Sequence, residues 1–205
     1  RELLTTLCVQ LDRLGVTDTL AFLSGLSWGS IFLRHTATET LNILLDASHR
    51  EKAEMHSLQE TLSEYLNSPQ GARTCQHLGE RLQGSIAWMK SRREAEQARL
   101  NSSKRGISHV AVALKVQEED PNDPGGCLEL IENLCSGNYS AGQGILSTQV
   151  NDRPVNFIVI TVQYLSACSK DIENNFKGIE AGFAALRASM SGPHLTNQYF
   201  LATET

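Results

Sequence analysis

Residues 155–190, VNFIVITVQYLSACSKDIENNFKGIEAGFAALRASM, decide the fold because their hydrophobic period changes partway along. The first part, 155–162, is β-branched and apolar, which is typical of a strand. From Leu165 onward the apolar residues recur at steps of three or four, which predicts one stripe on a helix. The stripe consists of Leu165, Cys168, Ile172, Phe176, Ile179, Phe183, Leu186 and Met190.

From Ile172 the steps alternate between four and three, which is close to the heptad seam of a coiled coil. Such a seam needs an apolar partner, in the same chain or in another copy. Gly178 and Gly182 add a GxxxG spacing that lets two backbones approach closely. We expect close packing inside the chain or a self-association face. The predicted interaction residues are Ile172, Phe176, Gly178, Ile179, Gly182, Phe183 and Leu186.

The composition is that of an ordinary soluble globular protein, with 40% hydrophobic and 20% charged residues in a chain of 205. Its longest apolar stretches, 20–33 and 155–168, are shorter than the roughly 20 residues of a membrane-spanning helix. Because the sequence starts at Arg1 without a Met, we expect a processed or excised fragment.

The net charge of −5 is unevenly distributed. Residues 1–105 contain 13 basic and 12 acidic side chains, whereas residues 106–205 contain 5 and 11. A nucleic-acid binder usually has a basic domain, so we expect no nucleic-acid partner. The five cysteines are odd in number and form no CxxC pair, which indicates reduced thiols in an intracellular, cytoplasmic protein.

Two long helices are predicted in the first half. Residues 31–66 contain no Pro or Gly, and Ser68-Pro69-Gln70-Gly71 then interrupts the pattern. A second helix follows over 72–100, and the short break predicts an antiparallel αα-hairpin. The inward-facing residues of the second helix are Cys75, Leu78, Leu82, Ile86 and Met89.

The polar segment 101–106 marks a change of period and a boundary. We expect a strand at 109–116, a hairpin between 145–150 and 155–162, and an extended tail. The fold class is therefore mainly α: an antiparallel helical bundle with long helices and a small inserted β element, with α+β as the alternative. The expected division has a helical bundle with the αα-hairpin over 1–103. It continues with the β element and the long C-terminal helix packing on the bundle over 104–192, and ends with a tail over 193–205.

Gly25-Leu26-Ser27-Trp28-Gly29 matches the G-x-S-x-G pattern that exposes a nucleophilic Ser on a sharp turn. A triad would need a base and an acid, for which the candidates are His194 and Asp171 or Asp152. Only 26 residues precede Ser27, too few for the earlier strands of an α/β-hydrolase. The plainer interpretation is a pair of small residues that lets helices pack closely.

Two charged segments can each be interpreted either as a binding site or as ordinary solvent-exposed structure. Asp120–Gly125 resembles the start of a calcium loop, but Pro124 occupies a ligand position, so a solvated acidic loop is favoured over a metal site. A basic run can contact phosphates or anionic lipid, or can place cations at a helix C-terminus. The run consists of Lys90, Arg92, Arg93, Arg99, Lys104 and Arg105.

These patterns favour a non-enzymatic interaction or assembly protein that acts through helix–helix association. The partner is another protein or a second copy, and no cofactor is expected. One alternative is a membrane-active bundle, either pore-forming or lipid-binding. The other is a serine hydrolase that uses Ser27.

Overall fold

The computed structural model describes residues 15–25, 31–46, 52–104, 120–147, 154–192 and 194–203, and within these ranges the chain forms helices and no strand. The mainly-α class is therefore confirmed. The α-helices are α2 (Val16–Ser24), α3 (Ile31–Leu45), α4 (Lys52–Leu66), α5 (Pro69–Lys104), α6 (Pro124–Cys135), α7 (Ser140–Ile145), α8 (Phe157–Cys168), α9 (Ile172–Met190) and α10 (Leu195–Thr203), and a short 3-10 helix, η2 (Ser136–Asn138), precedes α7.

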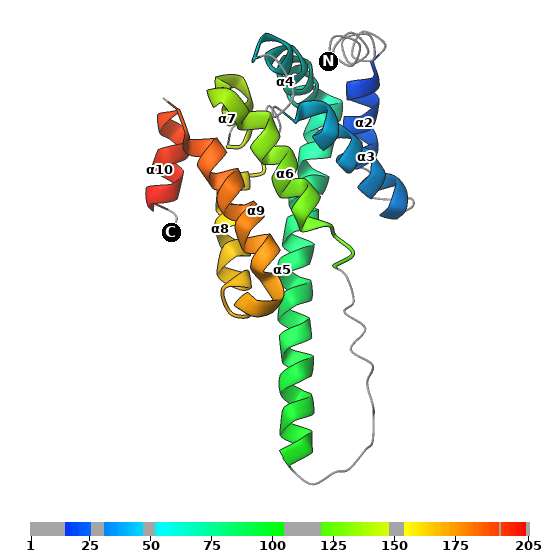
Figure 1. Ribbon diagram of the computed structural model, residues 1–205, viewed down its shortest axis with the longest axis vertical. Helices are drawn as coiled ribbons and strands as arrows, with labels where there is room; N and C mark the ends of the chain where they lie inside the picture. Colours follow the sequence, from blue (N-terminus) through cyan, green and yellow to red (C-terminus); the bar gives the residue numbers. More distant parts are fainter. Residues whose placement is uncertain are drawn as a thin grey trace.

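Helix α5 is the longest element, and the other helices gather around its N-terminal half (Figure 1). It begins at Pro69, where a proline costs no hydrogen bond because the first N–H groups of a helix have no intrahelical acceptor. Its 36 residues span about 54 Å. The C-terminal part extends beyond the other helices in Figure 1, and each residue from Glu94 to Asn101 is exposed.

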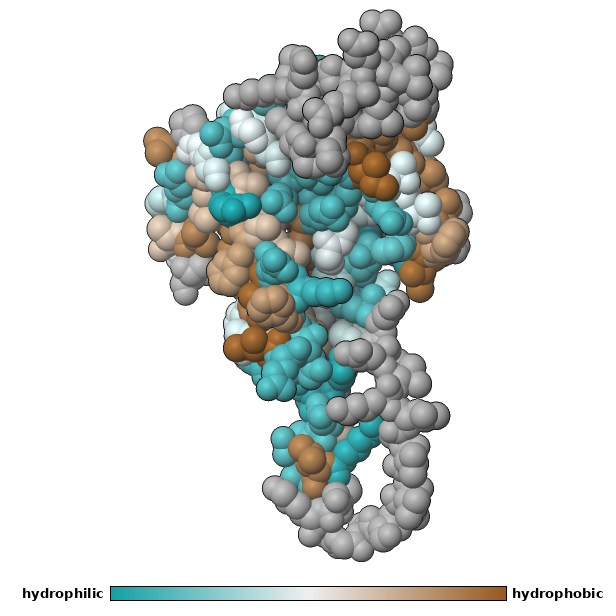
Figure 2. All heavy atoms as spheres, viewed as in Figure 1, coloured by the Kyte–Doolittle hydropathy of each residue, from teal (hydrophilic) through white to brown (hydrophobic). Residues whose placement is uncertain are grey.

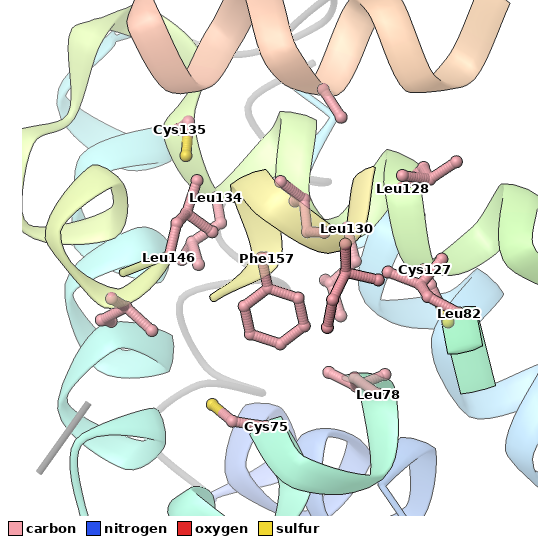
Figure 3. Packing of buried hydrophobic residues seen from close by; sticks show 14 of the residues in the cluster. Cys75, Leu78, Leu82, Cys127, Leu128, Leu130, Leu134, Cys135, Leu146 and Phe157 are labelled. Atoms are coloured by element: carbon pink, nitrogen blue, oxygen red, sulfur yellow. The ribbon is translucent and has the colours of Figure 1, made fainter. Parts of the chain in front are cut away.

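The core lies where α5, α6 and α8 meet. Leu82 and Leu128 are fully buried, and Phe157 at the start of α8 lies between Leu78 of α5 and Leu130 of α6 (Figure 3). Of the five residues predicted to face inward on α5, four are buried and Ile86 is half-buried, so that stripe is confirmed.

The predicted strand at 155–162 is wrong, because α8 begins at Phe157. Asn156 caps this helix, since its side-chain oxygen accepts a hydrogen bond from the Val159 N–H at 3.1 Å. The helix is buried on several sides, so its sequence is apolar almost throughout and carries no helical period. Without this strand the predicted hairpin does not form, and Ile145 is the last residue of α7.

Two further expectations differ from the structure, and a third is not tested. Residues 31–66 form two helices, because α3 ends at Leu45 and α4 begins at Lys52. Helix α3 packs beside α2 and α6, whereas α4 packs beside α5 and α7. The expected C-terminal tail contains α10, which is held by the buried Asn197 amide donating to the carbonyl oxygens of Gln143 at 2.9 Å and Ser189 at 3.1 Å. The strand expected at 109–116 lies outside the described residues.

The described cysteines are buried free thiols, in agreement with the expectation of reduced sulfur. Burial raises the pKa of Cys75, Cys127 and Cys135 to about 12. These thiols therefore stay protonated near neutral pH and act as small core hydrophobes. The cysteines described as free are Cys75, Cys127, Cys135 and Cys168.

Replacing Leu82 with Ala should lower the free energy of unfolding by about 2–5 kcal/mol, because the side chain is fully buried and its loss leaves a cavity. Leu100→Ala on the same helix is the matched control. Leu100 is 53% exposed, so its change should be within about 0.5 kcal/mol. Urea unfolding followed by circular dichroism measures both, and equal losses would contradict this placement of the core.

Candidate functional site

The predicted seam lies on α9, which packs beside α6 and α8 (Figure 1). Asp171 precedes the helix, and its carboxylate accepts hydrogen bonds from the Asn174 side chain at 2.9 and 3.0 Å. Gly182, Ala185 and Ser189 are buried against the neighbouring helices. One face of α9 is therefore already used inside the chain.

The two glycines of the GxxxG pattern face α8. A Cβ atom added to Gly182 would lie 2.7 Å from a methyl carbon of Leu165, and one added to Gly178 would overlap the Tyr164 hydroxyl. Both separations are too short for non-bonded heavy atoms, so a larger residue at either position requires the Leu165 or Tyr164 side chain to shift. Of the two interpretations of the GxxxG pattern, the structure shows close packing within the chain.

The aromatic side of the seam is exposed. Ile172, Phe176 and Phe183 are 56%, 65% and 61% exposed, while Ile179 is half-buried. Asn175 interrupts the helical backbone of α9 (φ −120°, ψ 17°), and Ile172 lies before this break. At 3.6 residues per turn the three residues that follow the break fall within an arc of about 60°. We call all four residues the α9 stripe. Leu186, the remaining residue of the predicted set, is buried.

Hydrophobic surface is visible over the lower end of α9 and along α3, with hydrophilic residues between (Figure 2). Along α3, Ile31, Phe32 and Ile43 are exposed, and sequence analysis did not single them out. A cleft of about 610 Å³ lies at the start of this helix. It is lined by Ile31, Phe32, Arg34, His35, Arg81, Asp120, Pro121, Asp123 and Pro124.

Carboxylates accompany the α9 stripe. Glu173 and Glu180 are exposed and one heptad apart, and they follow Ile172 and Ile179 directly in the sequence. Across the α6–α9 contact, the Arg187 guanidinium lies 3.7 Å from a carboxylate oxygen of Glu132. The exposed side of α9 therefore combines large apolar groups with charges of both signs, since Lys177 and Arg187 are exposed as well.

The acidic loop before α6 makes protein contacts with its carboxylates. Asp123 has a left-handed backbone (φ 47°) and caps α6, because its Oδ1 accepts from the Gly126 N–H at 3.1 Å. Its Oδ2 lies 3.1 Å from the Arg81 Nη2 and 2.9 Å from the His35 Nδ1. Among the described residues no group of three or more metal-ligating side chains occurs. The loop is built as a helix cap.

Arg81 is a buried charged residue that sequence analysis did not single out. It is 6% exposed and donates hydrogen bonds to the carbonyl oxygens of Ser24 at 3.2 Å and Asn122 at 3.0 Å, and to the Thr38 hydroxyl at 3.2 Å. It thus joins α2, α3 and α5 to the acidic loop. The available signal was an arginine directly before Leu82, on the inward side of α5.

Two of the candidate hydrolase residues, Asp171 and His194, are among the described residues, whereas Ser27 and Asp152 lie outside them. Asp171 precedes α9 and His194 follows it, so the two residues lie at opposite ends of that helix. A triad needs hydrogen-bond contact between its acid and its base, so these two residues cannot belong to one triad.

The basic run lies on the extended part of α5 and does not form one face. The Arg92 guanidinium stacks 5.4 Å from the Trp88 ring centroid, and the Arg93 Nε donates to the Met89 carbonyl oxygen at 3.3 Å. Lys90 and Arg99 project on opposite sides of the helix, as their spacing requires. The Lys104 side chain and Arg105 lie outside the described residues.

Comparison with known proteins gives one match. The model of the family described as "RyR and IP3R Homology associated" matches residues 125–205, which include most of α6 and all of α7 to α10. The chain is similar to that family over this part, and the α9 stripe lies within it. No curated protein and no solved structure matches the chain. In the part that the structure describes, no helix combines the length and apolar character needed to cross a membrane.

Gly182→Leu should lower the free energy of unfolding by about 1–3 kcal/mol, because the new side chain overlaps Leu165 and forces α8 and α9 apart. Lys177→Leu adds the same side chain at an exposed position of the same helix and should change stability by no more than about 0.5 kcal/mol. Chemical denaturation measures both. Equal effects would mean that the glycine side of α9 does not pack on α8.

Arg81→Met should destabilise the chain by about 3 kcal/mol, because Asp123 and the carbonyl groups of Ser24 and Asn122 lose a buried donor. Arg99→Met, at an exposed position of the same helix, should be close to neutral. Thermal unfolding of both variants is the measurement. A neutral Arg81→Met would show that the guanidinium is not a buried connector.

Proposed function

We propose that this chain is a non-enzymatic helical module of a larger assembly, and that the α9 stripe binds a partner helix. The observation that carries the proposal is the exposure of Ile172, Phe176 and Phe183 in a heptad-like register. Exposed apolar surface of this kind is typical of interaction sites. Fully burying a large apolar side chain contributes roughly 1.5–3 kcal/mol, so three of them give a partner helix substantial affinity.

The register of the stripe favours a helix over an irregular segment as its occupant. Ile172 and Ile179 are seven residues apart, as are Phe176 and Phe183. A helix with its own heptad pattern can insert side chains between Phe176 and Phe183, which both follow the break of α9 at Asn175. The other sides of α9 already contact α6 and α8, which leaves the stripe as the side open to a partner.

Two further observations support an assembly role. Similarity to the family described as "RyR and IP3R Homology associated" favours a domain within a larger receptor-channel type of protein. The short link between α4 and α5, together with their mutual contacts, supports an antiparallel bundle, and α9 packs on α6 and α8. In this proposal the rest of the chain is the scaffold for the stripe.

Site-specific photocross-linking tests this function. A benzoyl-phenylalanine at position 176 or 183, introduced into the full chain in its native cell, should cross-link to a discrete helical segment with heptad-spaced apolar residues. The same group at Leu100, which is similarly exposed on α5, is the control.

Cross-linking should be lost when the apolar side chains of the α9 stripe are replaced, even though the chain stays folded. Phe176→Asp together with Phe183→Asp should abolish the association while changing the free energy of unfolding by less than about 1 kcal/mol, because both side chains are exposed. Adducts at 176 and 183 that are no stronger than those at 100 would overturn the proposed function.

A further inference from the structure

Two exposed charges of opposite sign lie beside the phenylalanines of α9. Glu180 and Arg187 are seven residues apart, so they occupy the same position in successive heptads, and we call them the charged row. Both follow the break of the helical backbone at Asn175, as do Phe176 and Phe183. Each charged residue comes four positions after a phenylalanine, which places the charged row about 40° around the helix from the two rings.

Arg187 is only partly engaged within the chain. Its guanidinium lies 3.7 Å from a carboxylate oxygen of Glu132 on α6, which is longer than a good hydrogen bond. The side chain is 78% exposed in spite of this contact, and a guanidinium has five N–H donors. Arg187 can therefore pair with a second carboxylate outside the chain. Lys177 is exposed as well, but it lies about 60° further around the helix than Glu180, outside the charged row.

The opposite signs within the charged row restrict which helix can lie against it. A basic helix would pair with Glu180 but would meet Arg187 as a like charge, and an acidic helix would do the reverse. The row is satisfied by a helix that presents the same two charges, seven residues apart, in the opposite order. Helix α9 of a second copy presents this order when it runs antiparallel.

We propose that the partner of the α9 stripe is α9 of a second copy, packed antiparallel about a twofold axis between positions 183 and 184. This proposal rests on the proposed function and names the partner. The axis places Glu180 of each copy opposite Arg187 of the other, because the same edges of two antiparallel helices face each other. A parallel pair would put the two charged rows on opposite edges of the interface.

The same axis brings apolar side chains together. Phe183 lies next to the axis, so the Phe183 rings of the two copies meet there and can stack. Phe176 lies about 11 Å from the axis along the helix, close to the level of the half-buried Met190 of the second copy. Contacts between a thioether sulfur and an aromatic ring are favourable, and the symmetry makes this contact twice.

The phenylalanines and the charges have different roles in this dimer. Aromatic side chains near the centre of an interface supply much of its affinity, whereas an exposed ion pair changes an association constant by less than about fivefold. The charged row therefore sets the direction and the alignment of the two helices, and the apolar residues hold them together. A single pair of helices makes a small interface, so the association should be reversible and depend on concentration.

Sedimentation equilibrium of the full chain over a concentration series tests the dimer. The chain should show a reversible equilibrium between monomer and dimer. Phe183→Asp should weaken the association at least about tenfold, because the axis brings the two introduced carboxylates together. Leu100→Asp, which adds the same charge at an exposed position of α5, is the matched control and should leave the association constant unchanged. Circular dichroism confirms that each variant is folded.

Charge reversal tests the antiparallel direction. Glu180→Arg alone and Arg187→Glu alone should each weaken the dimer several-fold, because like charges then face each other across the interface. An equimolar mixture of these two variants should associate more tightly than either variant alone, and a chain with both substitutions should dimerise as the unsubstituted chain does. Added salt should reduce all of these differences. Lys177→Glu, outside the charged row, should leave the association constant nearly unchanged.

The outcomes separate this proposal from the proposed function. A chain that stays monomeric at every concentration, or a dimer that Phe183→Asp leaves intact, would overturn the second copy as the partner. A mixture of the two charge-reversed variants that associates no more tightly than each variant alone would overturn the antiparallel dimer. In each of these cases the cross-linking experiment decides the proposed function separately, since adducts from positions 176 and 183 to a different protein would leave the α9 stripe as an interaction surface.

Discussion

The buried guanidinium of Arg81 is the interaction on which the rest of the arrangement depends. A charged group removed from water is tolerated only when acceptors surround it, and here they come from α2, α3 and the segment before α6. These three parts of the chain must therefore occupy fixed positions relative to α5. Asp123 pairs with Arg81 and also caps α6, so the same contact fixes where α6 begins. Helix α6 in turn is one of the two helices against which α9 packs.

Buried side-chain amides also fix the positions of helices by donating hydrogen bonds to backbone carbonyl groups. The Gln59 side chain on α4 donates to the carbonyl oxygens of Asn133 at 2.7 Å and Ser136 at 3.0 Å, where α6 ends. The Asn42 side chain on α3 donates to the Gly126 carbonyl oxygen at 3.0 Å, where α6 begins. The last carbonyl groups of a helix lack intrahelical donors, so a donor from a neighbouring helix specifies how the two helices align. Apolar contacts alone would allow the helices to slide.

The parts of the fold that could be predicted are the helices with one side buried and the other side exposed to solvent. This holds for α5, whose stripe from Cys75 to Met89 was recognised. The stripe predicted on one helix from Leu165 to Met190 is divided instead, because α8 ends at Cys168 and α9 begins at Ile172. Helix α8 could not be predicted in this way, because burial on several sides removes the polar positions that reveal a helical period. Helix α10 was missed because its anchor, the Asn197 amide, is a tertiary contact that has no signature in the local sequence. For the candidate site, spacing predicted which residues share the stripe, but it could not show that the glycines face α8 while the aromatic residues stay exposed.

The extended part of α5 has a mechanical consequence. A helix of about ten residues is only marginally stable alone, but here it continues a helix whose first half is held in the core, so it behaves as a stiff rod. The portion from Glu94 to Lys104, the end of the helix, measures about 16 Å. A rotation of the packed half by roughly 10° would therefore displace the tip by about 3 Å. Because the two halves of α5 form one continuous helix, a reorientation of its packed half around Arg81 would also displace the residues that lie beyond the other helices.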